Sequence, residues 1–250
     1  RILRTLRVRP KGGIPPVSHG YLVEHGALLS GRRPSTVGWP FLGAITAAMR
    51  PGAVRDAEGK SLSEWLDGHV DDRSRTRMEA MFRVTSYLAD TDHVDASAAL
   101  TQLRRGARGV TYLHGGWSTL VDELRRAATV AGVRIESGSK VDRVDVGSHD
   151  GATVTVGDRA YDAHSVILAN GGPGHAARLL DGTSTLVDRW ATSARPVPAA
   201  CLDVSLRRLP VPEHTALLGA DRPTYLIVHS EAARLTPTGG GALIHAMRYG

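Results

Sequence analysis

The feature that most constrains the fold is a strand, glycine turn, helix and strand in the middle of the chain. Val110 to Leu113 is a short apolar run, Gly115-Gly116 predicts a turn, and Thr119 to Ala131 places apolar residues at helical spacing. Gly132 is typical of a helix end, and Val133 to Glu136 is apolar enough to resume as a strand. A helix between two strands is typical of a parallel crossover, so we expect an α/β fold.

A β-meander and a buried strand are predicted next. Val141 to Val146 and Ala152 to Val156 flank a glycine-containing turn, which predicts two antiparallel strands. Ser165 to Ala169 is a continuous apolar run, which suits a strand buried on both faces of a central sheet. The run leads through a glycine-rich turn into a helix that contains Leu179 and Leu180.

A second sheet is predicted from both ends of the chain. Gly20 to Leu29 alternates around His25-Gly26 and predicts a hairpin. Near the carboxyl end, three apolar runs are separated by connectors rich in proline and glycine: Ala199 to Leu206, Tyr225 to Val228 and Ala242 to Met247. We expect these runs to form a mostly antiparallel sheet that returns to the layer begun by the hairpin.

Helices are predicted between the hairpin and the central unit. Ser61 and Glu64 form a capping box, in which each side chain satisfies a free backbone N–H at the start of a helix. Helical spacing also predicts helices from Arg75 to Tyr87 and from Ala96 to Arg105. The uncharged run Val37 to Met49 is too short to cross a bilayer.

Composition excludes some classes of protein. With 250 residues, 42% hydrophobic and 22% charged, the chain can bury a sizeable core. Its net charge of +6 raises the question of nucleic acid, but aromatic residues are only 5% and no nucleic-acid-binding motif is present. We therefore expect a solvated basic face, with attraction to an anionic membrane surface as the next interpretation. The single cysteine, Cys201, excludes an intramolecular disulfide and is expected to be buried.

Several motifs resemble the middle of flavin amine oxidases, protoporphyrinogen oxidases and phytoene desaturases. They are Tyr112 to Leu124 with its Gly-Gly turn, Ala131 to Ile135, Val141 to Val144, and Tyr161 to Ala169 with its Val-Ile-Leu-Ala ending. The resemblance is most specific over residues 109 to 180. Because Arg1 stands where an initiator methionine is expected and Gly250 follows an apolar run, both ends are expected to be cuts through a longer chain.

The resemblance implies an α/β fold with two parts. One is part of a Rossmann-like FAD-binding domain, with a parallel sheet, a crossover helix and a β-meander. The other is an α+β substrate domain with a mostly antiparallel sheet. The implied division is 1–108 for a substrate or cap domain, 109–195 for part of the FAD-binding domain, and 196–250 for substrate-domain strands. The family's Gly-x-Gly-x-x-Gly fingerprint does not occur before the hairpin.

FAD is the cofactor that the resemblance implies. The residues expected beside it are Val141, Gly115, Gly116, Ala169, Asn170 and Gly171. The expected contact at Val141 is a backbone contact with adenine, and the alternative is an ordinary meander valine. At Gly115 and Gly116 a tight turn and a close approach to flavin both remain open, since glycine serves either.

The substrate cavity is expected beside the same turn, lined by His114 and Trp117. The alternative for His114 is a structural or exposed histidine. No catalytic residue is assigned. Asp90, Asp92, His93 and Asp95 share one loop, and we interpret them as turn and cap residues rather than a metal site, so no metal is predicted.

The function implied is that of a FAD-dependent oxidoreductase, which moves a hydride from an amine or a lipophilic C–H substrate to flavin. The expected partners are a small, lipophilic substrate and a peripheral membrane contact in the cytoplasm, without nucleic acid. The alternative is a noncatalytic binding or assembly module on the same fold. A nicotinamide enzyme that uses Gly172 to Ala177 is a third option, weakened because Pro173 removes one backbone donor.

Overall fold

The computed structural model describes residues 2–15, 20–30, 38–147, 151–169, 171–235 and 240–250. Its contacts divide the chain into two compact units, one of residues 1–127 with 197–250 and one of residues 128–196. The boundary between Ala127 and Ala128 lies inside helix α8 (Trp117–Val130). The expected boundary at 108/109 lies within the first unit, and the assignment of substrate and FAD-binding roles to the parts stays a prediction.

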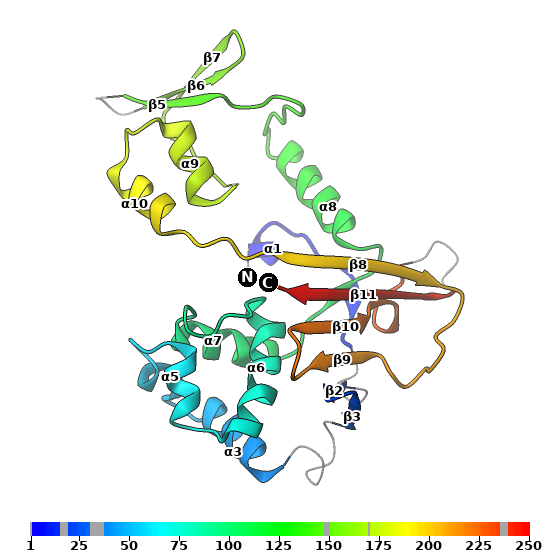
Figure 1. Cartoon of the computed structure of the whole chain (residues 1–250). Coiled ribbons are helices and arrows are strands. Elements are labelled where there is room, and N and C mark those ends of the chain that lie inside the picture. The colour runs from blue at the N-terminus through cyan, green and yellow to red at the C-terminus, as the bar shows by residue number, and fades with distance from the viewer. Residues whose placement is uncertain (1, 16–19, 31–37, 148–150, 170, 236–239) are drawn as a thin grey trace. The chain divides into compact units, whose positions relative to one another are not determined.

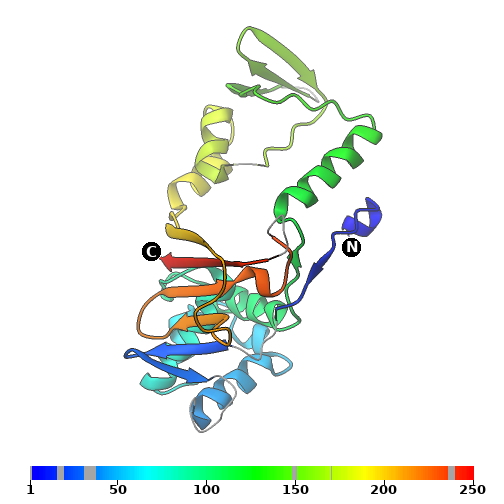
Figure 2. The same cartoon turned by 90° about the vertical axis from the view of Figure 1, so that its right-hand side faces the viewer.

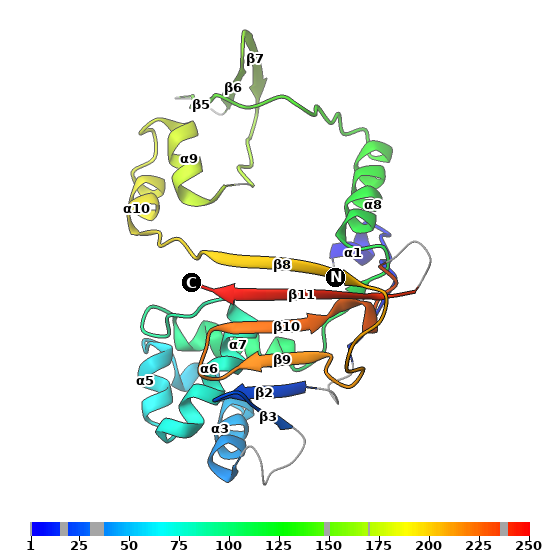
Figure 3. The same ribbon diagram turned by 45° about the vertical axis from the view of Figure 1, so that its right-hand side comes forward.

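A six-stranded sheet forms the first unit, with the order β3-β2-β9-β10-β11-β8 (Figure 3). Its strands are β2 (Gly20–Glu24), β3 (Ala27–Ser30), β8 (Ala199–Leu206), β9 (Ala216–Gly219), β10 (Thr224–Val228) and β11 (Ala242–Tyr249). All neighbours pair antiparallel except β2 with β9, which are parallel. The hairpin and the three strands predicted near the carboxyl end are confirmed, and β9 was not predicted.

Helices pack against the face of this sheet that carries Leu22 and Leu218 (Figures 1 and 2). They are α3 (Trp39–Met49), α4 (Ala53–Asp56), α5 (Leu62–Asp67), α6 (Asp72–Ser86) and α7 (Ala96–Gly106). Trp65, Phe82 and Leu100 are buried at the centre of the resulting core. The predicted helices are confirmed because their apolar stripes meet one another and the sheet.

The capping box at the start of α5 is also confirmed. The Ser61 hydroxyl accepts a hydrogen bond from the Glu64 N–H at 3.2 Å, and the Glu64 carboxylate accepts one from the Ser61 N–H at 2.7 Å. Both bonds satisfy backbone donors that the helix itself leaves without a partner. Helix α5 is only 6 residues long, so these two bonds account for a large share of the hydrogen bonds at its first turn.

Replacing Ser61 by alanine is expected to lower the free energy of unfolding by about 1 kcal/mol, the usual cost of losing an N-cap. Urea denaturation followed by circular dichroism measures the change. Thr46, whose exposed hydroxyl donates only to the Leu42 carbonyl within α3, provides the control, and Thr46→Ala should change stability by less. Equal losses in the two variants would contradict a capping role for Ser61.

The second unit contains the predicted meander and two helices. The meander strands are β5 (Arg143–Val146), β6 (Ala152–Val156) and β7 (Arg159–Ala163), all paired antiparallel. Helices α9 (Gly172–Leu180) and α10 (Thr185–Ser193) pack on each other, and α9 contacts β5. The meander and the helix after the glycine-rich turn are therefore confirmed.

The predicted parallel crossover sheet is not formed by the described residues. Strand β4 (Tyr112–Leu113) pairs antiparallel with β1 (Gly12–Gly13), and residues 133–136 and 165–169 are not strands. Ile167, expected to be buried on a central strand, is 88% exposed. A strand needs a neighbour for its backbone N–H and C=O groups, and no described segment pairs with these two.

The structure also bears on the expected burial of Cys201 and on the question of a membrane-spanning helix. Cys201 is exposed rather than buried, as are most residues of β8, the edge strand of its sheet. None of the helices in the described part of the chain has the length and apolar character that a bilayer-spanning segment needs.

Candidate functional site

The Gly115–Gly116 turn has a backbone that requires glycine. Both residues have positive φ, 74° at Gly115 and 78° at Gly116, in the left-handed region where side chains are strained. A Cβ atom on Gly115 would lie 2.7 Å from the Cγ2 atom of Thr119. The Gly115 N–H donates to the carbonyl of Arg234 at 2.8 Å, which ties the turn to the segment after β10.

His114 also forms a hydrogen bond with Arg234. Its Nδ1 accepts a hydrogen bond from the Arg234 N–H at 3.2 Å, so one ring nitrogen is engaged by the backbone. Trp117, the first residue of α8, is 75% exposed. The structure therefore gives His114 a structural bond, and the cavity role of both residues stays a prediction.

An aromatic–histidine cluster lies beside this turn in the first unit. It consists of Tyr87, Tyr112, Tyr225, His229, His245 and Tyr249. The ring of Tyr112, on β4, lies 4.7 Å from that of His229, in the short 3-10 helix η2 (His229–Glu231). His229 in turn stacks on His245 of β11 at 5.3 Å with an interplanar angle of 19°.

The tyrosines continue the cluster along the sheet. The ring of Tyr225, on β10, lies 5.9 Å from His245 and 6.2 Å from Tyr249. Tyr87, which ends α6, lies 6.4 Å from Tyr249. The cluster thus joins β4, η2, two central strands and the end of a helix through continuous ring contacts, and Tyr249 within it is buried.

Burial favours the neutral forms of four groups in this cluster, Tyr112, Tyr225, His229 and Tyr249. It raises the pKa of Tyr112 to about 12 and raises the pKa values of Tyr225 and Tyr249. Burial also lowers the pKa of His229, and a positive charge on the adjacent His245 would lower it further. The cluster accordingly offers uncharged phenol groups at Tyr112 and Tyr225 and an uncharged imidazole at His229.

The sequence-based reasoning missed most of this cluster. Tyr225 and His245 are 20 positions apart by number, and they meet only because β10 pairs with β11 in the register Ile227↔His245. Alternation places every second residue of a strand on one face, but the register between strands is needed to bring the faces together. Tyr112 was noticed as part of the glycine-turn motif and not as a site residue.

The remaining predicted residues lie in the second unit. Val141 lines a hollow of about 330 Å³ together with Val144, Val154, Leu168 and Leu179. Ala169 is exposed, and Asn170 lies outside the described residues. Gly171 precedes α9 with φ of 70°, where a Cβ atom would lie 2.6 Å from that of His175.

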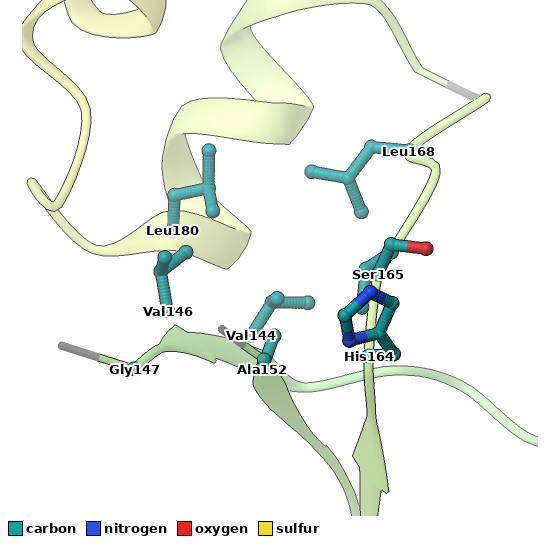
Figure 4. A pocket seen from close by; sticks show the side chains of 10 residues that line it. Val144, Val146, Gly147, Ala152, His164, Ser165, Leu168 and Leu180 are labelled. Atoms are coloured by element: carbon teal, nitrogen blue, oxygen red, sulfur yellow. The ribbon is translucent and has the colours of Figure 1, made fainter. Parts of the chain in front are cut away.

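A second hollow, of about 510 Å³, lies between the meander and α9 in the same unit. Figure 4 shows Val144 and Val146 on β5, Leu180 on α9 and Leu168 on the segment after β7 around this space. The structure therefore brings the Val141 region and the residues just before Ala169 to neighbouring apolar hollows, since Val144 and Leu168 line both.

The acidic loop forms turns and a cap, as predicted. Asp95 is the N-cap of α7 and accepts from the Ala98 N–H at 2.8 Å, while Asp90 accepts from the Asp92 N–H at 3.0 Å and contacts His93 at 2.5 Å. Within the described ranges, no three His, Cys, Asp or Glu side chains gather in a way that could hold a metal ion.

Solved structures share this fold, and some of them are oxidoreductases. The chain is similar to an oxidoreductase from Methanosarcina mazei, with 18% identity and a TM-score of 0.73, covering 99% of this chain and 63% of that one. It is also similar to cyclohexylamine oxidase from Brevibacterium oxydans, with 15% identity and a TM-score of 0.65, covering 98% and 60%. A protein from Pyrococcus furiosus matches with 16% identity and a TM-score of 0.73, covering 99% and 62%.

The sequence model of the flavin containing amine oxidoreductases matches residues 53–200, which is more than half of the chain. The chain belongs to this family. It spans about three fifths of the length of the structures it matches, 60% to 63%. No curated protein sequence matches it.

Proposed function

We propose that the whole protein is a FAD-dependent oxidoreductase that removes a hydride from an amine or a lipophilic C–H substrate. The observation that carries this proposal is the family match over residues 53–200. The mixed α/β fold shared with cyclohexylamine oxidase supports it at the level of architecture. When bound, the flavin supplies the hydride acceptor, and the protein supplies position and exclusion of water.

The adenine end of FAD would lie against the second unit. The hollow beside Val141 has mainly apolar walls, and Lys140 and His175 at its margin could reach polar atoms of the nucleotide. Its volume of about 330 Å³ is at the lower end of the range for ligand pockets, which suits one flat ring system. Val141 is the residue that we assign to the adenine, and we assign Ala169, Asn170 and Gly171 to FAD binding without placing them at either end.

The turn at Gly115–Gly116 would lie at the flavin end, with the aromatic–histidine cluster as a wall of the substrate cavity. Two adjacent glycines leave no side chain between the backbone and a ligand at this point. The uncharged phenols of Tyr112 and Tyr225 present apolar ring faces together with hydroxyl groups at their edges. Such a wall orients an apolar substrate and keeps water away from it.

We also propose that the protein is cytoplasmic and binds peripherally to a membrane surface, from which it takes up a lipophilic substrate. Arg4, Arg7 and Arg9 are exposed in the first residues of the chain. Ile2 and Leu6, on and just after the short helix α1 (Ile2–Thr5), are 76% and 45% exposed. Cationic and apolar side chains together are the combination that binds an anionic lipid surface. No nucleic-acid partner is proposed.

Purified full-length protein is expected to show the visible absorbance bands of bound flavin, or to acquire them when FAD is added and free FAD is removed. Added NAD should leave no bound nucleotide, because the Gly172–Ala177 segment forms the first turns of α9 with a proline among its first residues. A folded, colourless protein that takes up no FAD would contradict the proposal and favour the noncatalytic module.

A further inference from the structure

A cross-strand pair on β8 and β11 supplies a hydrogen-bond acceptor to the aromatic–histidine cluster. Asp203 lies directly opposite His245 in the strand register, and its carboxylate Oδ1 is 2.6 Å from the Nδ1 atom of His245. A carboxylate can only accept, so Nδ1 carries the proton. In the neutral ring Nε2 is then an acceptor. The His245 side chain is 17% exposed, and within the described residues its only hydrogen bond is the one at Nδ1.

The groups that face His245 come from three elements. They are Asp203 on β8, Tyr225 on β10 and His229 in η2, and the ring of Tyr112 on β4 lies beside that of His229. Burial disfavours the charged forms of Tyr112, Tyr225 and His229, so Asp203 contributes the negative charge of the group. The outcome is one accepting nitrogen, backed by a carboxylate and bordered by aromatic rings.

We propose that the Asp203–His245 pair binds the hydrogen-bond donor head of a ligand, an N–H or O–H group, while the attached apolar body lies against Tyr112 and Tyr225. A ligand with a cationic head should bind most tightly, since the carboxylate of Asp203 is close and neutral tyrosine rings attract cations. A hydrocarbon has no N–H or O–H donor, so the Asp203–His245 pair should add nothing to its affinity. The inference rests on the proposed function, and it selects a substrate with a polar N–H or O–H head from the two classes left open above.

The role given to Asp203 is to position His245 rather than to contact the ligand. Its hydrogen bond holds the proton on Nδ1 and leaves Nε2 available, so an asparagine at position 203 removes the charge and releases the tautomer. His93 and Asp90 form a matched pair elsewhere, with Nδ1 and Oδ2 2.5 Å apart on an exposed loop. Asp90→Asn therefore repeats the same chemical change away from the cluster.

The test uses the full-length protein and two probes of similar size, benzylamine and benzyl methyl ether. Nitrogen-15 NMR of the histidine rings, assigned with the His229→Asn and His245→Asn variants, reports hydrogen bonding at Nε2 directly. Benzylamine is expected to shift the Nε2 signal of His245 in a saturable manner. The ether, which has no donor, should bind at least fivefold more weakly and leave that signal in place.

Asp203→Asn should weaken benzylamine binding at least fivefold, and Asp90→Asn should leave it unchanged. Equal binding of the two probes, an unmoved Nε2 signal, or the same affinity in Asp203→Asn and in the unchanged chain would each overturn the inference. The flavin absorbance test is separate from this one. If the protein binds FAD but fails the probe test, only this inference is contradicted. If the protein binds no flavin, the proposed oxidoreductase function is contradicted.

Discussion

Replacing Arg77 by methionine is expected to lower the free energy of unfolding by about 3–5 kcal/mol, the range measured when one partner of a buried ion pair is removed. Arg77 lies on α6 and is 1% exposed. Its Nε and Nη2 atoms donate to the two carboxylate oxygens of Glu24, at 3.1 and 2.6 Å. Methionine fills much of the space but leaves the Glu24 carboxylate at the end of β2 with its charge largely uncompensated.

Urea denaturation of the unchanged protein and of the Arg77→Met variant measures this loss of stability. Arg50 provides the control. Arg50 pairs with Asp56 at 2.8 Å, but both side chains are nearly half exposed, so Arg50→Met should cost less than about 1 kcal/mol. If Arg77→Met and Arg50→Met lower the stability equally, the buried pair does not hold the hairpin to α6 in the way that we infer.

The same pair predicts a pH dependence with a definite sign. The hydrogen bond from Arg77 lowers the pKa of Glu24 below its ordinary value of 4.5. The ionised form is therefore favoured more in the folded than in the unfolded protein. This contribution to stability is present above the unfolded pKa and is lost as the pH falls through the lower, folded value. Arg77→Met should remove that part of the acid sensitivity.

Trp65→Ala is expected to have a comparable effect, about 3–5 kcal/mol, because a large buried side chain is removed and the core cannot close the cavity fully. Trp65 is 2% exposed on α5, stacks on His69 with ring centroids 4.2 Å apart, and meets the edge of Phe82 at 6.2 Å. Circular dichroism during urea denaturation measures the change, since it does not depend on tryptophan fluorescence.

Trp39 supplies the matched substitution. Its side chain, at the start of α3, is 77% exposed, so Trp39→Ala removes the same atoms with little loss of packing. We expect a change within about 0.5 kcal/mol, as for most surface substitutions. A loss in Trp39→Ala as large as that in Trp65→Ala would show that the core is not centred on α5.

Features that depend on neighbours in the sequence were predicted well. The hairpin around His25-Gly26 has both turn residues at positive φ, 50° and 78°, as a two-residue hairpin turn requires. The capping box at Ser61 and the helical stripe of α6 likewise follow from residues within one or two turns of each other. Local preferences decide these elements, and tertiary packing then reinforces them.

Predictions about distant partners were less successful. Val133 to Glu136 and Ser165 to Ala169 have the apolar character of strands, but the described residues provide no strand beside either. Conversely, β9 was not predicted, although it joins the hairpin to the strands near the carboxyl end. An apolar run indicates that a segment can be buried. Whether the segment pairs as a strand depends on the segments that lie beside it in the fold.

By itself, the amino-acid sequence determined the kinds of element, the meander and glycine turn that mark the family, and the residues expected near a flavin. The tertiary structure alone decided which side chains meet. Asp203 and His245 are 42 positions apart, yet the register of β8 with β11 places their ring and carboxylate 2.6 Å apart. Glu24 and Arg77 are 53 positions apart and meet across a hairpin and a helix. Such pairs depend on strand register and helix packing, which are set by the burial of the whole core rather than by local preference.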